Sequence, residues 1–70
     1  MELVKMTLKA ARVNKSLTQK KAAELIGISE STLYNYERGI TFPNGAVIKR
    51  IVEVYGVGYD NLIFLPQDND

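Results

Sequence analysis

Between positions 30 and 35 the sequence carries four side chains that can hydrogen-bond to, or pack against, the edges of nucleic-acid bases. Asn35 can pair bidentately with adenine N6 and N7, and Glu30 can accept a hydrogen bond from cytosine N4. Ser31 can donate or accept, and the ring of Tyr34 can contact a thymine methyl group. These residue types in this segment therefore predict a surface that reads base edges.

A helix from about Ser29 to Arg38 would bring these side chains together. A rotation of about 100° per residue separates a polar arc from an inward arc. The polar arc holds Glu30, Ser31, Tyr34, Asn35 and Arg38. The inward arc holds Ser29, Leu33, Tyr36 and Glu37. The alternative is a face that only contacts solvent, but such a face more typically carries Lys and Glu four residues apart, and this one does not.

Further residues are candidates for contacts to the phosphate backbone. Gln19 lies in the first turn of an expected helix, where backbone amides and the helix dipole both favour an anion. Its alternative role is that of a good helix former. The other candidates are Lys20 and three residues around the loop after the 29–38 helix, namely Arg38, Thr41 and Asn44. The alternative for Lys20 is a simply solvated side chain.

The elements that position these residues are short, and they show the periodicity of helices between glycine and proline residues. The expected N-caps are Thr18, Ser29 and Asn44, and the expected helix ends are Gly27, Gly39 and Gly56. A turn of about three residues joins the second and third helices, which is the spacing of a helix-turn-helix. The fourth helix is expected to bury Val47, Ile48, Ile51 and Val54 or Tyr55, and to turn Lys49, Arg50 and Glu53 outward.

The pattern as a whole predicts a compact, all-α domain. Its five short helices are expected at about 7–14, 18–27, 29–38, 44–55 and 59–64. Residues 1–65 would form this domain, and the polar tail 66–70 is expected to be disordered.

The composition argues against several classes of site. The 70 residues include no Cys and no His, which removes Ser-His and Cys-His nucleophile pairs and most zinc sites. We therefore expect no enzyme activity, no metal and no cofactor. The net charge is +1 but uneven, because six basic residues and Glu2 up to Lys21 give +5, and three basic and seven acidic residues from Ala22 give −4. The first part of the chain could face phosphates, or its lysines could only solvate helix surfaces.

The sequence shows no signal-peptide pattern and no apolar run of about 20 residues. The absence of cysteine fits a reducing compartment. We therefore expect a cytoplasmic protein with no membrane partner.

A set of residues spread along the chain resembles one family of domains. The set comprises Leu17-Thr18-Gln19 with Ala22-Ala23, Gly27-Ile28-Ser29, Leu33 with Tyr36-Glu37-Arg38-Gly39, Pro43, and Gly56-Val57 with Asp60-Asn61-Leu62. In type and spacing it resembles the phage-repressor and Cro type of helix-turn-helix domain, also called the Xre type, over about Met6 to Phe64. The resemblance implies a lambda-repressor-like DNA-binding domain of five helices that binds DNA as a symmetric pair.

The resemblance also implies roles for individual residues. It places Gln19 on phosphate and the loop 38–44 on the DNA backbone, and it pairs Arg12 with Glu37. The base-edge residues that it implies are Glu30, Ser31, Tyr34 and Asn35. Three positions depart from the family pattern: Tyr36 replaces a smaller aliphatic residue, Gly45 falls in the first turn of a helix, and Glu30 stands where a neutral amide side chain is common.

The expected function is that of a transcription regulator, a repressor, that binds a palindromic double-stranded DNA operator as a homodimer and takes no small-molecule ligand. Tyr59, Phe64 and Leu65 are the candidate dimer interface, because they offer more apolar surface than one small core can cover. The alternative is that Phe64 and Leu65 only close the core. The alternative function is a protein-interaction module, such as the antitoxin of a toxin-antitoxin pair.

Overall fold

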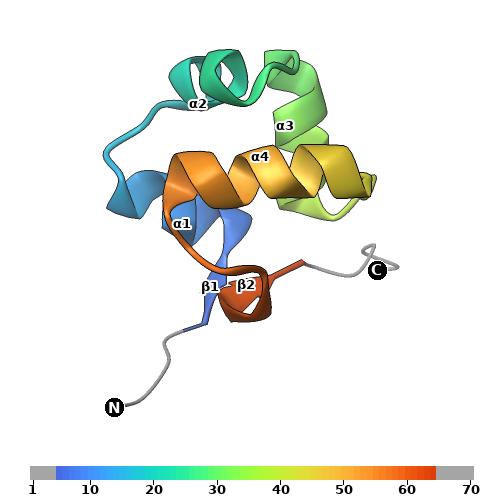
Figure 1. The fold of residues 1–70 in the computed structure, drawn as a ribbon. Helices are drawn as coiled ribbons and strands as arrows, with labels where there is room; N and C mark the ends of the chain where they lie inside the picture. Colours follow the sequence, from blue (N-terminus) through green and yellow to red (C-terminus); the bar gives the residue numbers. More distant parts are fainter. Residues whose placement is uncertain (1–4, 65–70) are drawn as a thin grey trace.

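The structure is a computed structural model, and it describes residues 5–64. Its α-helices are α1 (Leu8–Asn14), α2 (Gln19–Ile26), α3 (Glu30–Arg38) and α4 (Gly45–Tyr55). A 3-10 turn, η1 (Tyr59–Asn61), and two short strands, β1 (Met6–Thr7) and β2 (Leu62–Ile63), complete the described part of the chain. Figure 1 shows α2 and the start of α3 at one end of the molecule and the two strands at the other. Leu65 and the predicted tail 66–70 lie outside the described residues.

All four α-helices begin at an N-cap side chain that accepts a hydrogen bond from the backbone N–H three residues further on. These caps are Thr7, Thr18, Ser29 and Asn44, with oxygen–nitrogen distances of 3.0–3.1 Å. The three caps that the sequence predicts are confirmed. A cap is an interaction between near neighbours in the chain, so local sequence is enough to predict it.

Three of these helices end at a glycine in the left-handed conformation, as the sequence predicts. The glycines are Gly27, Gly39 and Gly56, with φ angles of 89°, 75° and 67°. The end of α1 differs, because Ser16 takes the left-handed conformation there with φ 60°. The N–H of Leu17 donates to the carbonyl of Arg12 at 3.2 Å, so Ser16 occupies the position that glycine fills at the other ends.

The predicted fifth helix at 59–64 is wrong, and the described part of the chain has four α-helices. Only one 3-10 turn forms after Gly58, which makes no side-chain cap hydrogen bond. Leu62 is extended, with φ −95° and ψ 136°, and β2 pairs in parallel with β1, Met6 opposite Leu62 and Thr7 opposite Ile63. The paired backbone of β1 offers hydrogen bonds that one more turn of helix would forgo, and a β-branched residue such as Ile63 suits a strand.

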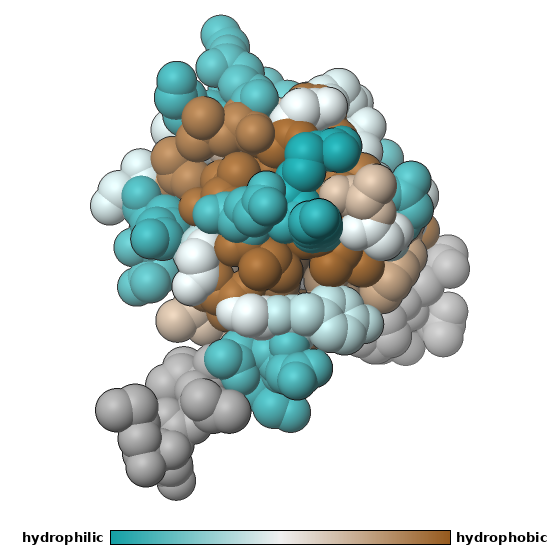
Figure 2. All heavy atoms as spheres, in the orientation of Figure 1, coloured by the Kyte–Doolittle hydropathy of each residue, from teal (hydrophilic) through white to brown (hydrophobic). Residues whose placement is uncertain are grey.

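The core lies where the four helices meet. Its buried apolar members are Leu8, Ala11, Ala22, Ala23, Ile26, Leu33, Val47, Ile51, Tyr55 and Leu62. Of the residues predicted to face inward on α4, Val47, Ile51 and Tyr55 are buried, whereas Ile48 and Val54 stay partly exposed. Figure 2 shows apolar side chains gathered across the middle of the face that α4 crosses in Figure 1, with polar side chains among and around them.

Arg50 of α4 connects two helices. Its side chain is exposed, as predicted, yet its Nε donates a hydrogen bond to the backbone carbonyl of Ile26 at 2.7 Å. Ile26 is the last residue of α2, where carbonyl groups lack intrahelical partners and a cation is favoured. Arg50 therefore holds the end of α2, immediately before the turn that leads to α3.

Candidate nucleic-acid interface

A short turn fixes α3 relative to α2. Gly27, Ile28 and Ser29 separate the two helices, which is the predicted spacing. The N–H groups of Gly27 and Ile28 both donate to the carbonyl of Ala23, at 2.8 and 3.0 Å. The left-handed Gly27 reverses the chain, and a side chain at this φ would strain the backbone. Ser29 then caps α3, so local interactions define both ends of the turn.

One face of α3 packs on the core and the other is open to solvent. Leu33 and Glu37 are buried, and Tyr36 packs partly buried against the core. The residues of the polar arc are largely accessible: Glu30, Ser31, Tyr34 and Arg38 are exposed, and Asn35 is partly exposed. The structure thus brings the four candidate base-edge residues to one accessible helix face.

Hydroxyl groups cluster at the start of α3. Ser29 Oγ accepts from the N–H of Thr32 at 3.0 Å and also lies 2.7 Å from Thr32 Oγ1. Ser31 Oγ lies 3.3 Å from the same Ser29 oxygen. Thr32 is not among the predicted site residues, although the cap pattern of Ser29 marks its backbone N–H as the expected donor. Ser31 is therefore held by its neighbour before any ligand arrives.

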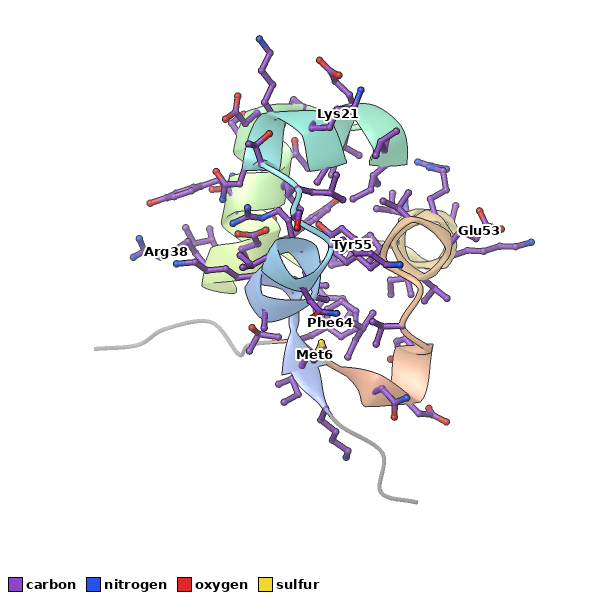
Figure 3. All side chains as sticks on the ribbon, turned by 90° about the vertical axis from the view of Figure 1, so that its left-hand side faces the viewer. Met6, Lys21, Arg38, Glu53, Tyr55 and Phe64 are labelled. Carbon is purple, nitrogen blue, oxygen red and sulfur yellow. The ribbon has the colours of Figure 1, made fainter. Side chains whose placement is uncertain are left out.

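Tyr34 and Arg38 form a second contact on the exposed face of α3. Arg38 Nη1 donates to Tyr34 Oη at 2.9 Å, and the guanidinium carbon lies 5.6 Å from the centroid of the tyrosine ring. In Figure 3 Arg38 projects outward on the side of the molecule away from Glu53, and Tyr55 lies between the helices. Because the two residues are four apart, one helix turn is enough to bring them together.

Arg12 and Glu37 form a buried ion pair beneath this face. Arg12 Nε lies 2.7 Å from Glu37 Oε2, with 11% and 4% of the two side chains exposed. Arg12 also donates to Glu37 Oε1 at 3.2 Å and to the carbonyl of Leu17 at 2.9 Å. The hydrogen bonds to Glu37 raise the pKa of Arg12 above its already high ordinary value. Arg12 therefore stays charged, and the ion pair ties α1 to the buried face of α3.

Gln19 joins the same cluster. Its Nε2 donates to Glu37 Oε1 at 3.0 Å, a contact that the sequence analysis missed because it spans two helices. The side-chain amide is therefore turned toward Glu37. The backbone N–H groups of Gln19 and Lys20 lie in the first turn of α2, where no intrahelical acceptor exists. An anion at this helix end would meet these N–H groups and the exposed Lys20.

The loop after α3 carries the remaining phosphate candidates. Thr41 is exposed, and Asn44 is exposed although its Oδ1 accepts from the N–H of Val47 at 3.0 Å. The cap occupies the carbonyl oxygen of Asn44 and leaves its NH₂ group for another acceptor. Thr41 and Asn44 flank Phe42, which is 62% exposed.

Three aromatic side chains form a surface cluster at the end of the molecule opposite α2. The Phe42 and Phe64 ring centroids are 5.0 Å apart, and those of Tyr59 and Phe64 are 5.8 Å apart. Phe64 is partly buried against the core, whereas Tyr59 is 54% exposed. Tyr59 and Phe64 are predicted from the sequence, whereas Phe42 is not, because its position in a loop next to Pro43 gives no periodic signal. Phe64 thus both packs on the core and remains accessible.

Within residues 5–64 the structure contains no group of three or more acidic, His or Cys side chains that could hold a metal ion. No helix in the same range is long and apolar enough to span a membrane.

Comparison with known proteins places these features in a family. The sequence matches the Helix-turn-helix family over residues 8–62, a range that includes all four α-helices. Over 56 residues it is 38% identical to the HTH-type transcriptional regulator ImmR of Bacillus subtilis (strain 168). That match covers 80% of this chain but 44% of the relative, so the chain spans less than half the length of that relative. The chain belongs to the helix-turn-helix family, of the phage-repressor or Xre type that its residues resemble.

Proposed function

We propose that the chain is a sequence-specific DNA-binding transcription regulator in which α3 enters the major groove. The observation that carries this proposal is the accessible polar face of α3, held by a three-residue turn and by a buried opposite face. The major groove is about 12 Å wide and admits one helix with its side chains directed at base edges. The name of the ImmR relative supports regulation of transcription as the role.

The base-edge contacts are assigned to Glu30, Ser31, Tyr34 and Asn35. Asn35 is the main specificity residue in this proposal, because a bidentate pair with adenine discriminates more strongly than a single hydrogen bond. Glu30 lies in the first turn of α3 and accepts from a cytosine N4 amine, which compensates for its repulsion by phosphates. The partly exposed Asn35 and the exposed Glu30 occupy the same helix face.

The backbone contacts flank this helix on both sides. The free amides at the start of α2 and the ammonium of Lys20 bind one phosphate. Thr41 and the NH₂ group of Asn44 bind the strand on the other side of the groove, beyond the end of α3. These contacts fix the register of α3 and carry no sequence information themselves.

The chain acts as a repressor that binds a palindromic operator as a homodimer. Half-sites about 34 Å apart place two copies of α3 in successive major grooves on one side of the duplex. The aromatic cluster of Phe42, Tyr59 and Phe64 supplies the dimer contact, with Leu65 adjacent in sequence. Exposed aromatic rings that lie together favour association, since burying them removes a large apolar area from water.

A selection of binding sites from random duplex DNA tests the proposal. We expect enrichment of a two-fold symmetric site, with affinity that falls by orders of magnitude between about 50 and 200 mM salt as counterions are released. A chain that enriches no site at low salt contradicts the proposal. The aromatic cluster would then favour the second candidate, a protein-interaction module such as an antitoxin.

A further inference from the structure

The contact between Tyr34 and Arg38 bears on what Tyr34 offers to a ligand. Arg38 Nη1 donates to Tyr34 Oη at 2.9 Å, and the same guanidinium carbon lies 5.6 Å from the ring centroid. One side chain thus contacts both the hydroxyl and the ring of the other. Cation–π attraction and a hydrogen bond act in the same geometry, so the tyrosine loses freedom before DNA is present.

Arg38 has no carboxylate partner within residues 5–64. The salt bridges in that range join Arg12 to Glu37 and Lys21 to Glu24. Glu37 precedes Arg38 in the chain, but its carboxylate is buried, whereas Arg38 projects outward (Figure 3). The guanidinium is therefore available to hold Tyr34.

The direction of this hydrogen bond constrains the tyrosine hydroxyl. A tyrosine oxygen can donate and accept, whereas arginine can only donate. The contact therefore uses an acceptor lone pair of Tyr34 and leaves its O–H proton for another acceptor. In the major groove thymine presents a C5-methyl group next to the O4 acceptor. A tyrosine ring that contacts the methyl group and a hydroxyl that donates to O4 would match both features.

We infer that Arg38 is a positioning residue, which holds Tyr34 so that its ring and its hydroxyl proton read a thymine·adenine pair. This inference rests on the proposed function, because it assigns roles on the same face of α3. An arginine that only bound phosphate would instead strengthen binding to every sequence alike. The two roles therefore differ in their effect on sequence preference.

The test compares four variants with the wild-type chain: Tyr34→Phe, Arg38→Met, the double variant of both, and Lys20→Met. Each is put through selection on random duplexes, and its affinity for the wild-type site is measured across salt concentrations. Arg38→Met keeps an unbranched apolar stem and removes the donors, and Lys20→Met removes a charge that does not contact Tyr34. Tyr34 and Arg38 are exposed, so the variants keep the fold, which thermal melts verify.

Tyr34→Phe and Arg38→Met are each expected to lower the preference for thymine by about tenfold at one and the same position. The double variant should lose no more than Tyr34→Phe alone, because both substitutions remove one shared interaction. Lys20→Met should weaken binding to all sequences and leave the preference unchanged.

Two results would overturn the inference in distinguishable ways. If Arg38→Met behaves like Lys20→Met, with a salt slope reduced by about one and an unchanged preference, Arg38 is a phosphate ligand and the proposed function stands. If the wild-type chain enriches no site, the proposed function fails and this inference fails with it.

Discussion

Arg12 Nε lies 2.7 Å from Glu37 Oε2, and this ion pair joins α1 to the buried face of α3. Glu37 also accepts from Gln19 at 3.0 Å. Residues from α1, α2 and α3 thus meet at one carboxylate. A buried pair is weak evidence for net stability, because desolvation can exceed the Coulombic gain. The effect of the pair on the arrangement of the helices is more direct, because it fixes the orientation of α3 relative to α1 and α2.

Replacing Arg12 by Ala is expected to destabilise the fold strongly. The substitution removes three hydrogen bonds and leaves the Glu37 carboxylate buried without its cation. Breaking a buried pair in this way costs about 3–5 kcal/mol, so we expect the free energy of unfolding in urea to fall by more than about 2 kcal/mol. The double variant Arg12→Met with Glu37→Leu should lose less, because it leaves no unpaired charge. A wild-type urea midpoint for Arg12→Ala would refute the buried role of this pair.

Replacing Ser16 by Gly is expected to stabilise the protein. Ser16 has φ 60°, which costs a residue with a side chain roughly 1–2 kcal/mol relative to its preferred conformations. Glycine avoids this strain but has more freedom in the unfolded chain, so a net gain of about 0.5–1 kcal/mol remains. Thermal melts of Ser16→Gly should show a higher midpoint. Ser16→Ala is the control, and an equal rise in that variant would count against the strain argument.

Replacing Arg50 by Ala is expected to weaken the junction between α2 and α4. The hydrogen bond from its Nε to the carbonyl of Ile26 is 2.7 Å long and partly buried. A hydrogen bond from a charged donor contributes about 1.5–3 kcal/mol to stability. Because this one is partly exposed, we expect the free energy of unfolding to fall by an amount near the lower end of that range. Lys49→Ala is the matched control, because Lys49 is an exposed cation on the same helix. Similar urea midpoints for the two variants would contradict the assigned role of Arg50.

Tyr55 is expected to make stability depend on pH in the alkaline range. Burial, with the nearby charge of Glu37 as a lesser cause, raises the pKa of Tyr55 from 10.0 to about 12. The folded state therefore holds its proton longer than the unfolded state. The resulting stability is present below pH 10 and is lost as the pH rises to 12, by about 2–3 kcal/mol.

The control for this titration is Tyr55→Phe. The hydroxyl has no hydrogen-bond partner within residues 5–64, so at neutral pH its removal should change stability by less than about 1 kcal/mol. Between pH 10 and 12 the difference in stability between the two proteins should shift in favour of the phenylalanine variant. If the urea midpoints of the wild-type protein and Tyr55→Phe keep a constant difference across that range, the raised pKa of Tyr55 is contradicted.

The sequence predicts those parts of the fold that depend on near neighbours. Ser29 and Gly27 mark the ends of the turn through interactions within a few residues, and both positions are confirmed. The prediction of a fifth helix is wrong because Leu62 pairs with Met6, more than 50 residues away in the chain, and no local pattern encodes that pairing. Leu62 is buried in the strand, with 7% of its surface exposed.

In the candidate site, too, the features that depend on near neighbours could be predicted and those that depend on distant contacts could not. The accessible arc of α3 could be predicted, because helical rotation alone places Tyr34 and Asn35 opposite Leu33. The contacts of Gln19 with Glu37 and of Phe42 with Phe64 could not, since each joins segments that only the folded chain brings together. The contact of Arg38 with Tyr34 has the four-residue spacing of helix neighbours, which is a signal that the sequence does contain.

The most direct test of the central claim is the affinity of Asn35→Ala for two duplexes, one carrying the site selected by the wild-type chain and one carrying its shuffled sequence. If α3 reads bases through this face, the variant should bind the selected duplex at least about tenfold more weakly and the shuffled duplex unchanged. Unchanged binding of both duplexes, or an equal loss on both, would contradict base reading by α3.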